Sequence, residues 1–222
     1  MTTVGFIGSG SIGGTVARLA VAAGHDVVLS NSRGPETLRG LVTELGDPAR
    51  AATPPEVAAD AELIVVSVPF HAYTTLPVAQ LAGKVVLDTN NYYAARDGNI
   101  TELDEGKLTS AELEQQHLGP ARLVKVFNNI YFQHLHNLAR PAGAADRTTL
   151  TIAGDDAEAK RAATEFLDSI GYDAYDIGSL ADSWRVEPGQ PAYGPPYGTG
   201  DDPAGTPASA AKVRAAVEAA SR

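Results

Sequence analysis

Cysteine is absent from the 222-residue sequence, and its absence excludes several kinds of chemistry at once. The chain has no disulfide bonds, no thiolate metal ligands and no cysteine nucleophile. A chain without cysteine suits the reducing cytosol, so we expect a cytoplasmic protein. The sequence also contains no HExxH and no GxSxG motif, so we expect neither a catalytic metal site nor serine hydrolase chemistry.

Basic residues are few, with 17 Lys and Arg against 27 Asp and Glu, and the formal net charge is −10. An acidic chain without a basic cluster is a poor match for nucleic acid or an anionic membrane surface. The longest strongly apolar run, Leu63 to Phe70, falls far short of the roughly 20 residues that cross a bilayer. The N-terminal residues show no signal-peptide pattern. We therefore expect a small-molecule substrate, with no nucleic-acid or membrane partner.

Short apolar runs rich in Val and Ile alternate with longer helical patterns. Continuous apolar strands are typical of a parallel sheet that is covered on both faces. The predicted strands are residues 4–7, 27–29, 63–66, 85–87, 123–126, 149–153 and 172–176, and the predicted helices are 12–23, 35–45, 110–118 and 155–170. This alternation predicts an α/β protein with a doubly wound, mainly parallel sheet of the Rossmann type.

The composition changes after Val186, where residues 187–207 become rich in proline and glycine. We expect two parts: residues 1–185, a Rossmann domain with an extra strand-helix-strand unit, and residues 186–222, an arm with a terminal helix. Thr206 and Pro207 are suitable as the cap and first residue of a helix from Ala208 to Ser221. The arm is a lid, a partner-binding arm or a linker. Its tyrosines, Tyr193 and Tyr197, favour a lid over a substrate pocket or a contact with another subunit.

A GxGxxG motif lies between the first predicted strand and the first predicted helix. Gly8 permits the tight turn, Gly10 lets the backbone approach a pyrophosphate, and Gly13 lets the helix pack closely on the strand. The phosphates then sit at a helix N-terminus. A glycine-rich turn that binds nothing is the alternative. The strand before the motif and the helix after it favour dinucleotide binding.

The end of the second predicted strand reads Asn31-Ser32-Arg33, where NAD-binding proteins usually carry a carboxylate for the ribose hydroxyls. Asn31 and Ser32 are uncharged donors, and Arg33 offers a planar fork that suits phosphate oxygens. These residues favour NADP(H) over NAD(H). The alternative is that Arg33 is only a solvated loop residue.

Three further predicted strands end in polar segments at the edge of the sheet where ligands bind. These segments are 67–71 (Ser-Val-Pro-Phe-His), 88–91 (Asp-Thr-Asn-Asn) and 127–129 (Phe-Asn-Asn). The side chain of Asn90 or Asn128 could bond a ribose or the nicotinamide carboxamide. Either could equally cap a turn through its own backbone.

The motifs in this order resemble the NADPH-dependent coenzyme F420 reductase family, whose members are F420-dependent NADP oxidoreductases. The resemblance rests on GFIGSGSIGGTVARLAVAAGHDVVLSNSR, SVPF, DTNN, VKVFNNI and IAGDDAEAK with GYDAYDIGSL, and it extends to about Leu180. The arm and the Ala-rich helix depart from the family pattern, and that region helps to shape the second-substrate pocket.

The resemblance implies a Rossmann domain that holds NADP(H) and transfers hydride directly to or from a deazaflavin, coenzyme F420. The implied cofactor contacts are Ser9, Ser11 and Ile12 at the pyrophosphate, Ser32 and Arg33 at the 2′-phosphate, Ser67, Val68 and Pro69 beside the adenosine ribose, and Asn128 near the nicotinamide. Hydride transfer asks mainly for position, with the reacting carbons about 3 to 3.5 Å apart. A homodimer is also expected.

A proton donor is still needed for a reduced deazaflavin or for another product. His71 is the candidate catalytic residue because it follows a strand end, although a structural role in the loop explains it as well. Tyr92 and Tyr93 could bond a substrate or simply pack. His134 and His136 diverge on a predicted helix and do not form a metal pair. The alternatives to deazaflavin reduction are reduction of a small imine or carbonyl compound and a non-catalytic NADP(H) sensor.

Overall fold

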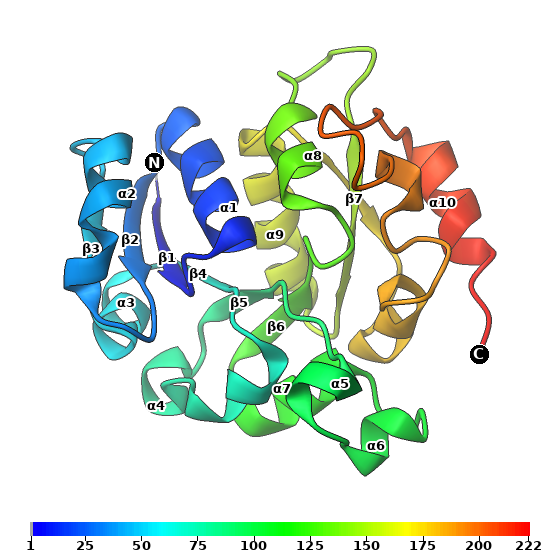
Figure 1. The fold of residues 1–222 in the computed structure, drawn as a ribbon, viewed down its shortest axis with the longest axis horizontal. Coiled ribbons are helices and arrows are strands. Elements are labelled where there is room, and N and C mark those ends of the chain that lie inside the picture. The colour runs from blue at the N-terminus through cyan, green and yellow to red at the C-terminus, as the bar shows by residue number, and fades with distance from the viewer. Residues whose placement is uncertain (1) are drawn as a thin grey trace.

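Eight strands form one sheet in the order β3-β2-β1-β4-β5-β6-β7-β8 in a computed structural model that describes residues 2–222 (Figure 1). Neighbouring strands run parallel except β6 and β7, which are antiparallel. The strands are β1 (Thr3–Ile7), β2 (Asp26–Ser30), β3 (Ala49–Ala51), β4 (Leu63–Val66), β5 (Val85–Asp88), β6 (Arg122–Lys125), β7 (Thr149–Gly154) and β8 (Asp173–Asp176). The predicted α/β fold with a mainly parallel, doubly wound sheet is confirmed.

The helices connect these strands and pack against both faces of the sheet (Figure 1). The α-helices are α1 (Ser11–Ala22), α2 (Arg39–Leu45), α3 (Pro54–Asp60), α4 (Val78–Leu81), α5 (Ala94–Asp97), α6 (Thr101–Asp104), α7 (Ser110–Leu118), α8 (Phe132–Asn137), α9 (Ala157–Ser169) and α10 (Ala210–Glu218). The 3₁₀ helices are η1 (Pro35–Leu38), η2 (Phe70–Thr75), η3 (Leu180–Val186) and η4 (Pro195–Tyr197).

Apolar residues on both faces of the central strands explain why these strands read as continuous hydrophobic runs. Successive side chains of a strand point to opposite faces. In β4, for example, Leu63 and Val65 belong to one hydrophobic core, with α1 and α9, while Ile64 and Val66 belong to a second core, with α3 and α7. A strand with apolar side chains on both faces must be covered by other elements on both sides of the sheet.

Side-chain caps fix where several helices begin. Asp156 accepts a hydrogen bond from the amide of Ala159 at the start of α9. Capping boxes begin α3 and α7, and each pairs a threonine with a glutamate three residues later. The strand β3 and the helix α3 were not predicted, although the capping box Thr53 to Glu56 was readable in the sequence.

The arm, residues 187–207, packs against the rest of the protein between α8 and α10 (Figure 1). Tyr197 is fully buried, and its hydroxyl donates to the carbonyl of Thr149 in β7 at 3.2 Å. Our expectation that Tyr197 contacts a ligand or a partner is therefore wrong, because its ring fills the protein core. The side chains of Ala192 and Ala208 are buried in the same core.

The terminal helix is shorter than predicted. It begins at Ala210, and the side chain of Ser209 caps it by accepting from the amide of Lys212. The backbone just before it is used elsewhere: Thr206 donates to the carbonyl of Tyr197, and Ala208 accepts from the amide of Thr149. Residues 206–208 therefore cannot enter the helix, and the predicted cap at Thr206 is wrong.

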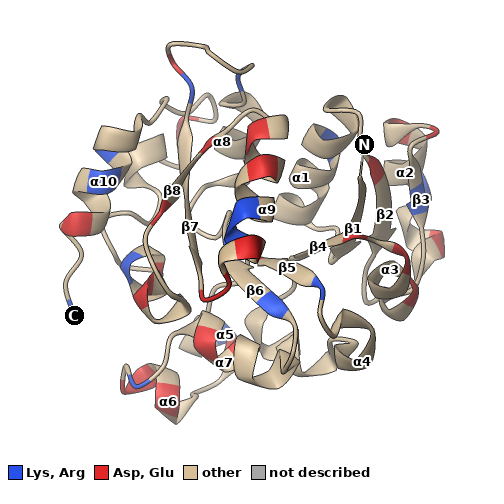
Figure 2. Cartoon of the chain, turned by 180° about the vertical axis from the view of Figure 1, so that it is seen from behind, with Lys and Arg blue, Asp and Glu red and all other residues tan. Residues whose placement is uncertain are grey.

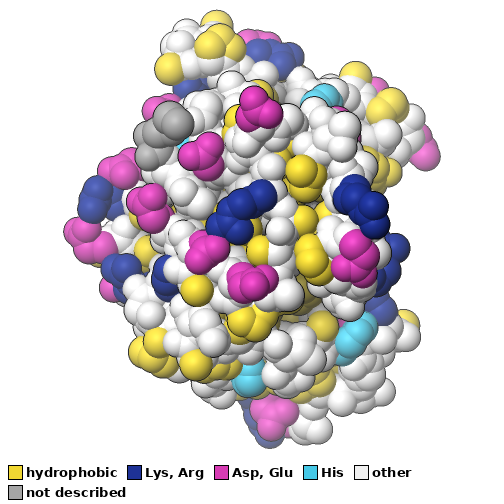
Figure 3. Space-filling model, turned by 90° about the vertical axis from the view of Figure 1, so that its left-hand side faces the viewer, with side chains coloured by type: hydrophobic (Ala, Val, Ile, Leu, Met, Phe, Trp, Pro, Cys, Tyr) yellow, Lys and Arg dark blue, Asp and Glu magenta, His cyan; other side chains and the backbone are white. Residues whose placement is uncertain are grey.

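Acidic and basic side chains are interspersed on the faces shown in Figures 2 and 3, including the exposed side of α9. Within residues 2–222, no helix is long and apolar enough to cross a membrane. The same residues contain no group of three or more His, Asp or Glu side chains arranged to hold a metal ion.

Candidate functional site

Three adjoining hollows form a crevice along the carboxyl ends of the parallel strands. The first, the Arg33 hollow, has a volume of about 440 Å³, the middle hollow about 270 Å³ and the Asn128 hollow about 280 Å³. The Arg33 and middle hollows share residues 67–69 and Gly10, and the middle and Asn128 hollows share Ile12, Thr89 and Asn91. The three hollows therefore lie side by side along β2, β1, β4, β5 and β6, where open α/β sheets bind ligands.

The glycine turn lies at the centre of this crevice, and each of its glycines has a different reason to be there. A Cβ on Gly8, whose φ is 101°, would lie 2.1 Å from the carbonyl oxygen of Ser67. A Cβ on Gly13 would lie 2.1 Å from the carbonyl oxygen of Gly8. A Cβ on Gly10 would meet no protein atom within 4 Å, so the space above Gly10 is open to a ligand.

The N-terminus of α1 is also free to meet a ligand. No side chain caps this helix, so its first amides point into the crevice beside Gly10. The hydroxyl of Ser9 donates to the carbonyl of Ser30 at 3.0 Å and ties the turn to β2. Because the hydroxyl of Ser9 is occupied, its backbone rather than its side chain suits a phosphate, together with Ser11 and Ile12 at the start of α1.

The loop after β2 presents Ser32 and Arg33 to the Arg33 hollow. The carboxamide of Asn31 holds this loop: its oxygen accepts from the amide of Arg33 at 2.9 Å, and its nitrogen donates to the hydroxyl of Thr37 at 2.9 Å. Both Ser32 and Arg33 are exposed, and the guanidinium of Arg33 has no hydrogen bond or ion pair with residues 2–222. Asn31 thus shapes the loop, while Arg33 remains available to an anion.

His71 lines the Arg33 hollow and is absent from the lining of the Asn128 hollow. Its ring Nδ1 lies 2.9 Å from the carboxylate of Asp97, and about half of its side chain is exposed. The predicted catalytic role stays a prediction. The ring of His71 therefore lies at the same end of the crevice as Arg33.

Asn90 is buried at the floor of the middle hollow, and both ends of its carboxamide are already used. Its oxygen accepts from the amide of Val68 at 2.9 Å, and its nitrogen donates to Glu114 at 2.9 Å. It therefore fixes the segment that carries Val68 and Pro69 at the crevice wall. A direct bond from Asn90 to a ribose stays a prediction, and it would require one of these contacts to open.

Asn128 and Asn129, which follow β6, hold the arm in place. Asn128 donates to the carbonyl of Val186 at 2.9 Å, and Asn129 donates to the carbonyl of Ala192 at 2.9 Å. The side-chain oxygen of Asn128 is buried without a protein hydrogen-bond partner, and this residue lines the Asn128 hollow. A buried acceptor without a partner is costly, so this oxygen suits a donor group of a ligand.

The Asn128 hollow is mainly apolar and aromatic. Its lining includes Phe127, Tyr131, Phe132 and Tyr193, and no Asp, Glu, Lys, Arg or His is among the residues that line it. The backbone of Phe127 has a φ of 63°, and it is the one non-glycine residue with positive φ within residues 2–222. Strained backbone of this kind often occurs at functional sites. Sequence reasoning missed Phe127, because nothing in its side chain signals this conformation.

Part of this chain matches a known protein family. Residues 3–92, which contain the glycine turn, Arg33, His71 and Asn90, match the family described as coenzyme F420-dependent NADP oxidoreductases. For residues 3–92, the match confirms the resemblance that the motifs indicated.

Three similar proteins match more of this chain than the family model does. Metalloreductase STEAP3 of Rattus norvegicus is 31% identical over 187 residues, which make up 83% of this chain and 35% of that protein. The chain thus spans about a third of this relative. A hypothetical protein from Sinorhizobium meliloti, SMa0349, is 28% identical with a TM-score of 0.74, covering 86% of this chain and 92% of its own.

The third similar protein shares the fold of this chain. It is a proposed F420-dependent NADP reductase from Arthrobacter sp. FB24, which is 24% identical with a TM-score of 0.69 and covers 82% of this chain and 87% of its own. Asn128 and the arm lie outside the residues that match the family. The family therefore accounts for the Arg33 end of the crevice more directly than for the Asn128 end.

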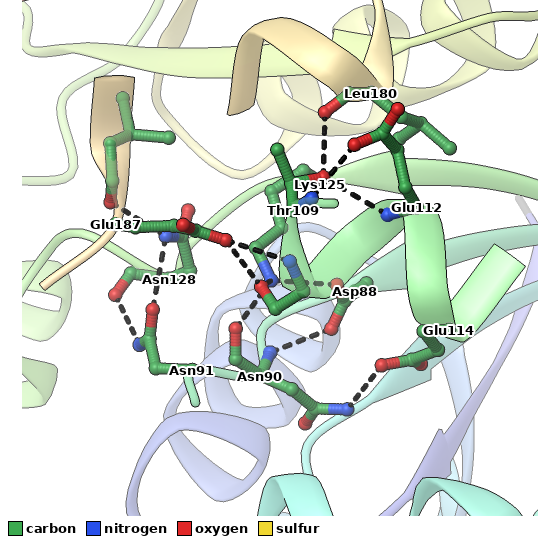
Figure 4. Close-up of polar contacts among 12 residues, drawn as sticks. Asp88, Asn90, Asn91, Thr109, Glu112, Glu114, Lys125, Asn128, Leu180 and Glu187 are labelled. Atoms are coloured by element: carbon green, nitrogen blue, oxygen red, sulfur yellow. Dashed lines mark hydrogen bonds and ion pairs between the residues drawn. The ribbon is translucent and has the colours of Figure 1, made fainter. Parts of the chain in front are cut away.

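A buried ionic cluster surrounds Asn90, which is one of the residues that line the middle hollow (Figure 4). Lys125 donates to the carboxylate of Asp88 at 2.8 Å and to the carbonyl of Asn90, and both charged side chains are almost fully buried. Glu114 is also buried and accepts from Asn90. Burial, followed by repulsion from Asp88, raises the pKa of Glu114 to about 8. The cluster thus pairs Lys125 with Asp88 and leaves Glu114 protonated at neutral pH.

Proposed function

We propose that the chain is an NADP(H)-dependent oxidoreductase that transfers hydride between NADPH and a flat, deazaflavin-type acceptor such as coenzyme F420. The observation that carries this proposal is the row of adjoining hollows, with Arg33 at one end and an aromatic hollow at the other. Its length and chemistry suit an extended dinucleotide with a second ring beside the nicotinamide.

The cofactor is proposed to lie with its adenosine half in the Arg33 hollow. Ser32 and Arg33 then bind the 2′-phosphate, Val68 and Pro69 border the ribose, and the turn amides bind the pyrophosphate. His71 would contact the adenosine half in this arrangement. The open space above Gly10 and the unpartnered amides of α1 support this placement.

The nicotinamide is proposed to lie in the Asn128 hollow. Its carboxamide can donate to the unpartnered side-chain oxygen of Asn128, which fixes one face of the ring. When bound, the cofactor supplies the hydride, and the protein supplies alignment and excludes water. Tyr193 and Gly194 of the arm help to line this hollow, so the arm is proposed as a fixed cover rather than as a linker.

One observation favours a second candidate, reduction of a small imine or carbonyl compound. The hydroxyl of Tyr93 contacts the hydroxyl of Tyr193, which lines the Asn128 hollow, and such a pair could supply a proton. The absence of any Asp, Glu, Lys, Arg or His from this lining favours the deazaflavin, because hydride transfer between two rings depends mainly on position. A non-catalytic sensor would bind NADPH and turn over neither acceptor.

Coenzyme F420 and NADPH deuterated at the transferring carbon provide the decisive test. We expect loss of the visible absorbance of F420 and movement of deuterium from NADPH to the deazaflavin carbon. Turnover of a cyclic imine with no turnover of F420 would reject the deazaflavin proposal and support the second candidate. Tight NADPH binding with neither reaction would support the sensor. Light scattering on the same protein would test the expected homodimer.

A further inference from the structure

One buried carboxylate organises the outer wall of the crevice. The side chain of Asp97 is fully buried, and it accepts hydrogen bonds from three residues. The guanidinium of Arg96 donates twice, from Nε and Nη2, at 2.8 Å each. The amide of Tyr93 donates at 2.9 Å, and the ring Nδ1 of His71 lies at 2.9 Å. Burial works to raise the pKa of Asp97, but these hydrogen bonds hold it well below its ordinary value.

Arg96 is held on three sides and free on the fourth. Besides Asp97, its Nη2 donates to the carbonyl of Asn91 at 2.7 Å, and its guanidinium lies 4.9 Å from the centre of the Tyr93 ring. Its Nη1 makes no hydrogen bond with residues 2–222. Because Asp97, Asn91 and Tyr93 fix the plane of the guanidinium, the free nitrogen has a set position and little rotamer freedom left to lose.

The charge of Arg96 is paired with Asp97, which is not among the residues that line the middle hollow. Arg96 itself lines this hollow together with Gly10, Ser11 and Ile12, and no other charged side chain is among the lining residues. The glycine turn from Gly8 to Gly13 contains no Lys or Arg, and the chain as a whole carries a formal charge of −10. An anion in the middle hollow would therefore find backbone amides on the side of the turn and a single cation on the other wall.

We propose that Arg96 binds the pyrophosphate of the dinucleotide across the middle hollow from the glycine turn. The inference rests on the proposed NADP(H) site, which puts the pyrophosphate beside Gly10 and Ser11. A guanidinium is the side chain best suited to phosphate oxygens, since it offers directed donors and a permanent charge. Arg96 thereby adds a side-chain contact to the pyrophosphate, which the amides of the glycine turn bind from the other side.

The affinities of three ligands distinguish binding of the pyrophosphate by Arg96 from a purely structural role of this residue. NADPH and 2′-phospho-ADP-ribose contain the pyrophosphate, and 2′-AMP carries only the 2′-phosphate that Arg33 is proposed to bind. In Arg96→Ala we expect the Kd of the first two to rise about tenfold, the low end for a charged hydrogen bond, because 43% of the Arg96 side chain is exposed. The Kd of 2′-AMP should change by less than about twofold, since its only phosphate lies at the other hollow.

Arg96→Lys and Arg161→Ala complete the set. Lysine keeps the charge but not the fork, so Arg96→Lys should recover part of the lost affinity for NADPH. Arg161 is exposed on α9, where it pairs with Glu158 and Glu165, and its removal should change none of the three affinities. Thermal unfolding of each variant shows whether it is folded at the temperature of the titration.

Several results would overturn the inference. An NADPH affinity that is the same in Arg96→Ala and the wild type would do so, including the case in which only the KM of an anionic acceptor rises. An equal loss for 2′-AMP would also overturn it, because the wall around Asp97 would then have collapsed as a whole. A wild-type protein that binds none of the three ligands would reject the proposed function itself, whereas a failure confined to the Arg96 variants would reject this inference alone.

Discussion

We expect the protein to become less stable as the pH rises, because the buried carboxyl group of Glu114 then loses its proton. The carboxyl group lies in the buried cluster of Figure 4, where Lys125 already pairs with Asp88 and one oxygen of Glu114 has no hydrogen-bond partner. Ionising Glu114 would add a second negative charge beside Asp88, away from water. The change to test is Glu114→Gln, which removes the titrating group and keeps the acceptor for Asn90.

The sign follows from the two pKa values. Burial first, and Asp88 second, raise the pKa of Glu114 from 4.5 to about 8 in the folded protein. Between these values the folded chain holds a proton that the unfolded chain has lost, so the free energy of unfolding falls with pH by up to about 1.4 kcal/mol per unit. This stabilising contribution is complete below pH 4.5 and is lost as the pH rises through about 8. From pH 5 to pH 8 the wild type should therefore lose a few kcal/mol that Glu114→Gln does not lose.

Urea unfolding at pH 5, 6, 7 and 8, followed by the fluorescence of Trp184, measures this directly. We expect Glu114→Gln to gain stability over the wild type steadily with pH. Glu165→Gln serves as the control because Glu165 is exposed on α9, and it should follow the wild type. A stability difference between Glu114→Gln and the wild type that does not change with pH would refute the reasoning, since the carboxyl group would then be ionised in the fold or titrate as it does in water.

Three further predictions concern the cofactor and the arm. Arg33→Ala should weaken NADPH about tenfold, by loss of a charged hydrogen bond at an exposed site, and leave NADH unchanged; Arg39→Ala, which removes a nearby exposed arginine, should affect neither in the same titration. Gly10→Val should abolish NADPH binding in a protein that melts like the wild type, whereas Gly8→Ala should lower the melting temperature because its Cβ would lie 2.1 Å from a carbonyl oxygen. Tyr197→Ala should reduce the free energy of unfolding by about 3 to 5 kcal/mol, and Tyr193→Ala by clearly less while changing turnover of the acceptor, as urea unfolding and steady-state rates would show.

The parts of the fold that the sequence predicted depend on local chemistry. The glycine turn and the strands buried on both faces each occupy a few neighbouring residues, and their physical reasons lie within those residues. The strand β3 has only three residues and follows a turn, so its apolar pattern is too short to read. Its pairing with β2, not its composition, makes it a strand.

The parts that were missed depend on contacts between distant residues. Asn128 donates to a carbonyl 58 positions away, and Asn129 donates to one 63 positions away. No pattern around these asparagines indicates that they hold the arm. The position of Asp97 was missed for the same reason, because its contact with His71 spans 26 positions. Tyr197 lies in the proline- and glycine-rich arm, which was expected to be a lid, a partner-binding arm or a linker, and its burial depends on contacts with distant residues.

The two ends of the crevice are therefore built in different ways, and this difference bears on the choice of acceptor. The Arg33 end is assembled from residues that all lie before position 92 and belong to the family match. The Asn128 end combines residues 127–132 with Tyr193 and Gly194 of the arm, which lie far apart in the sequence. A change in the arm can thus reshape the acceptor side while Arg33, Gly10 and α1 keep the same contacts. We therefore expect that substitutions in the arm alter turnover of the proposed acceptor more than they alter the affinity for NADPH.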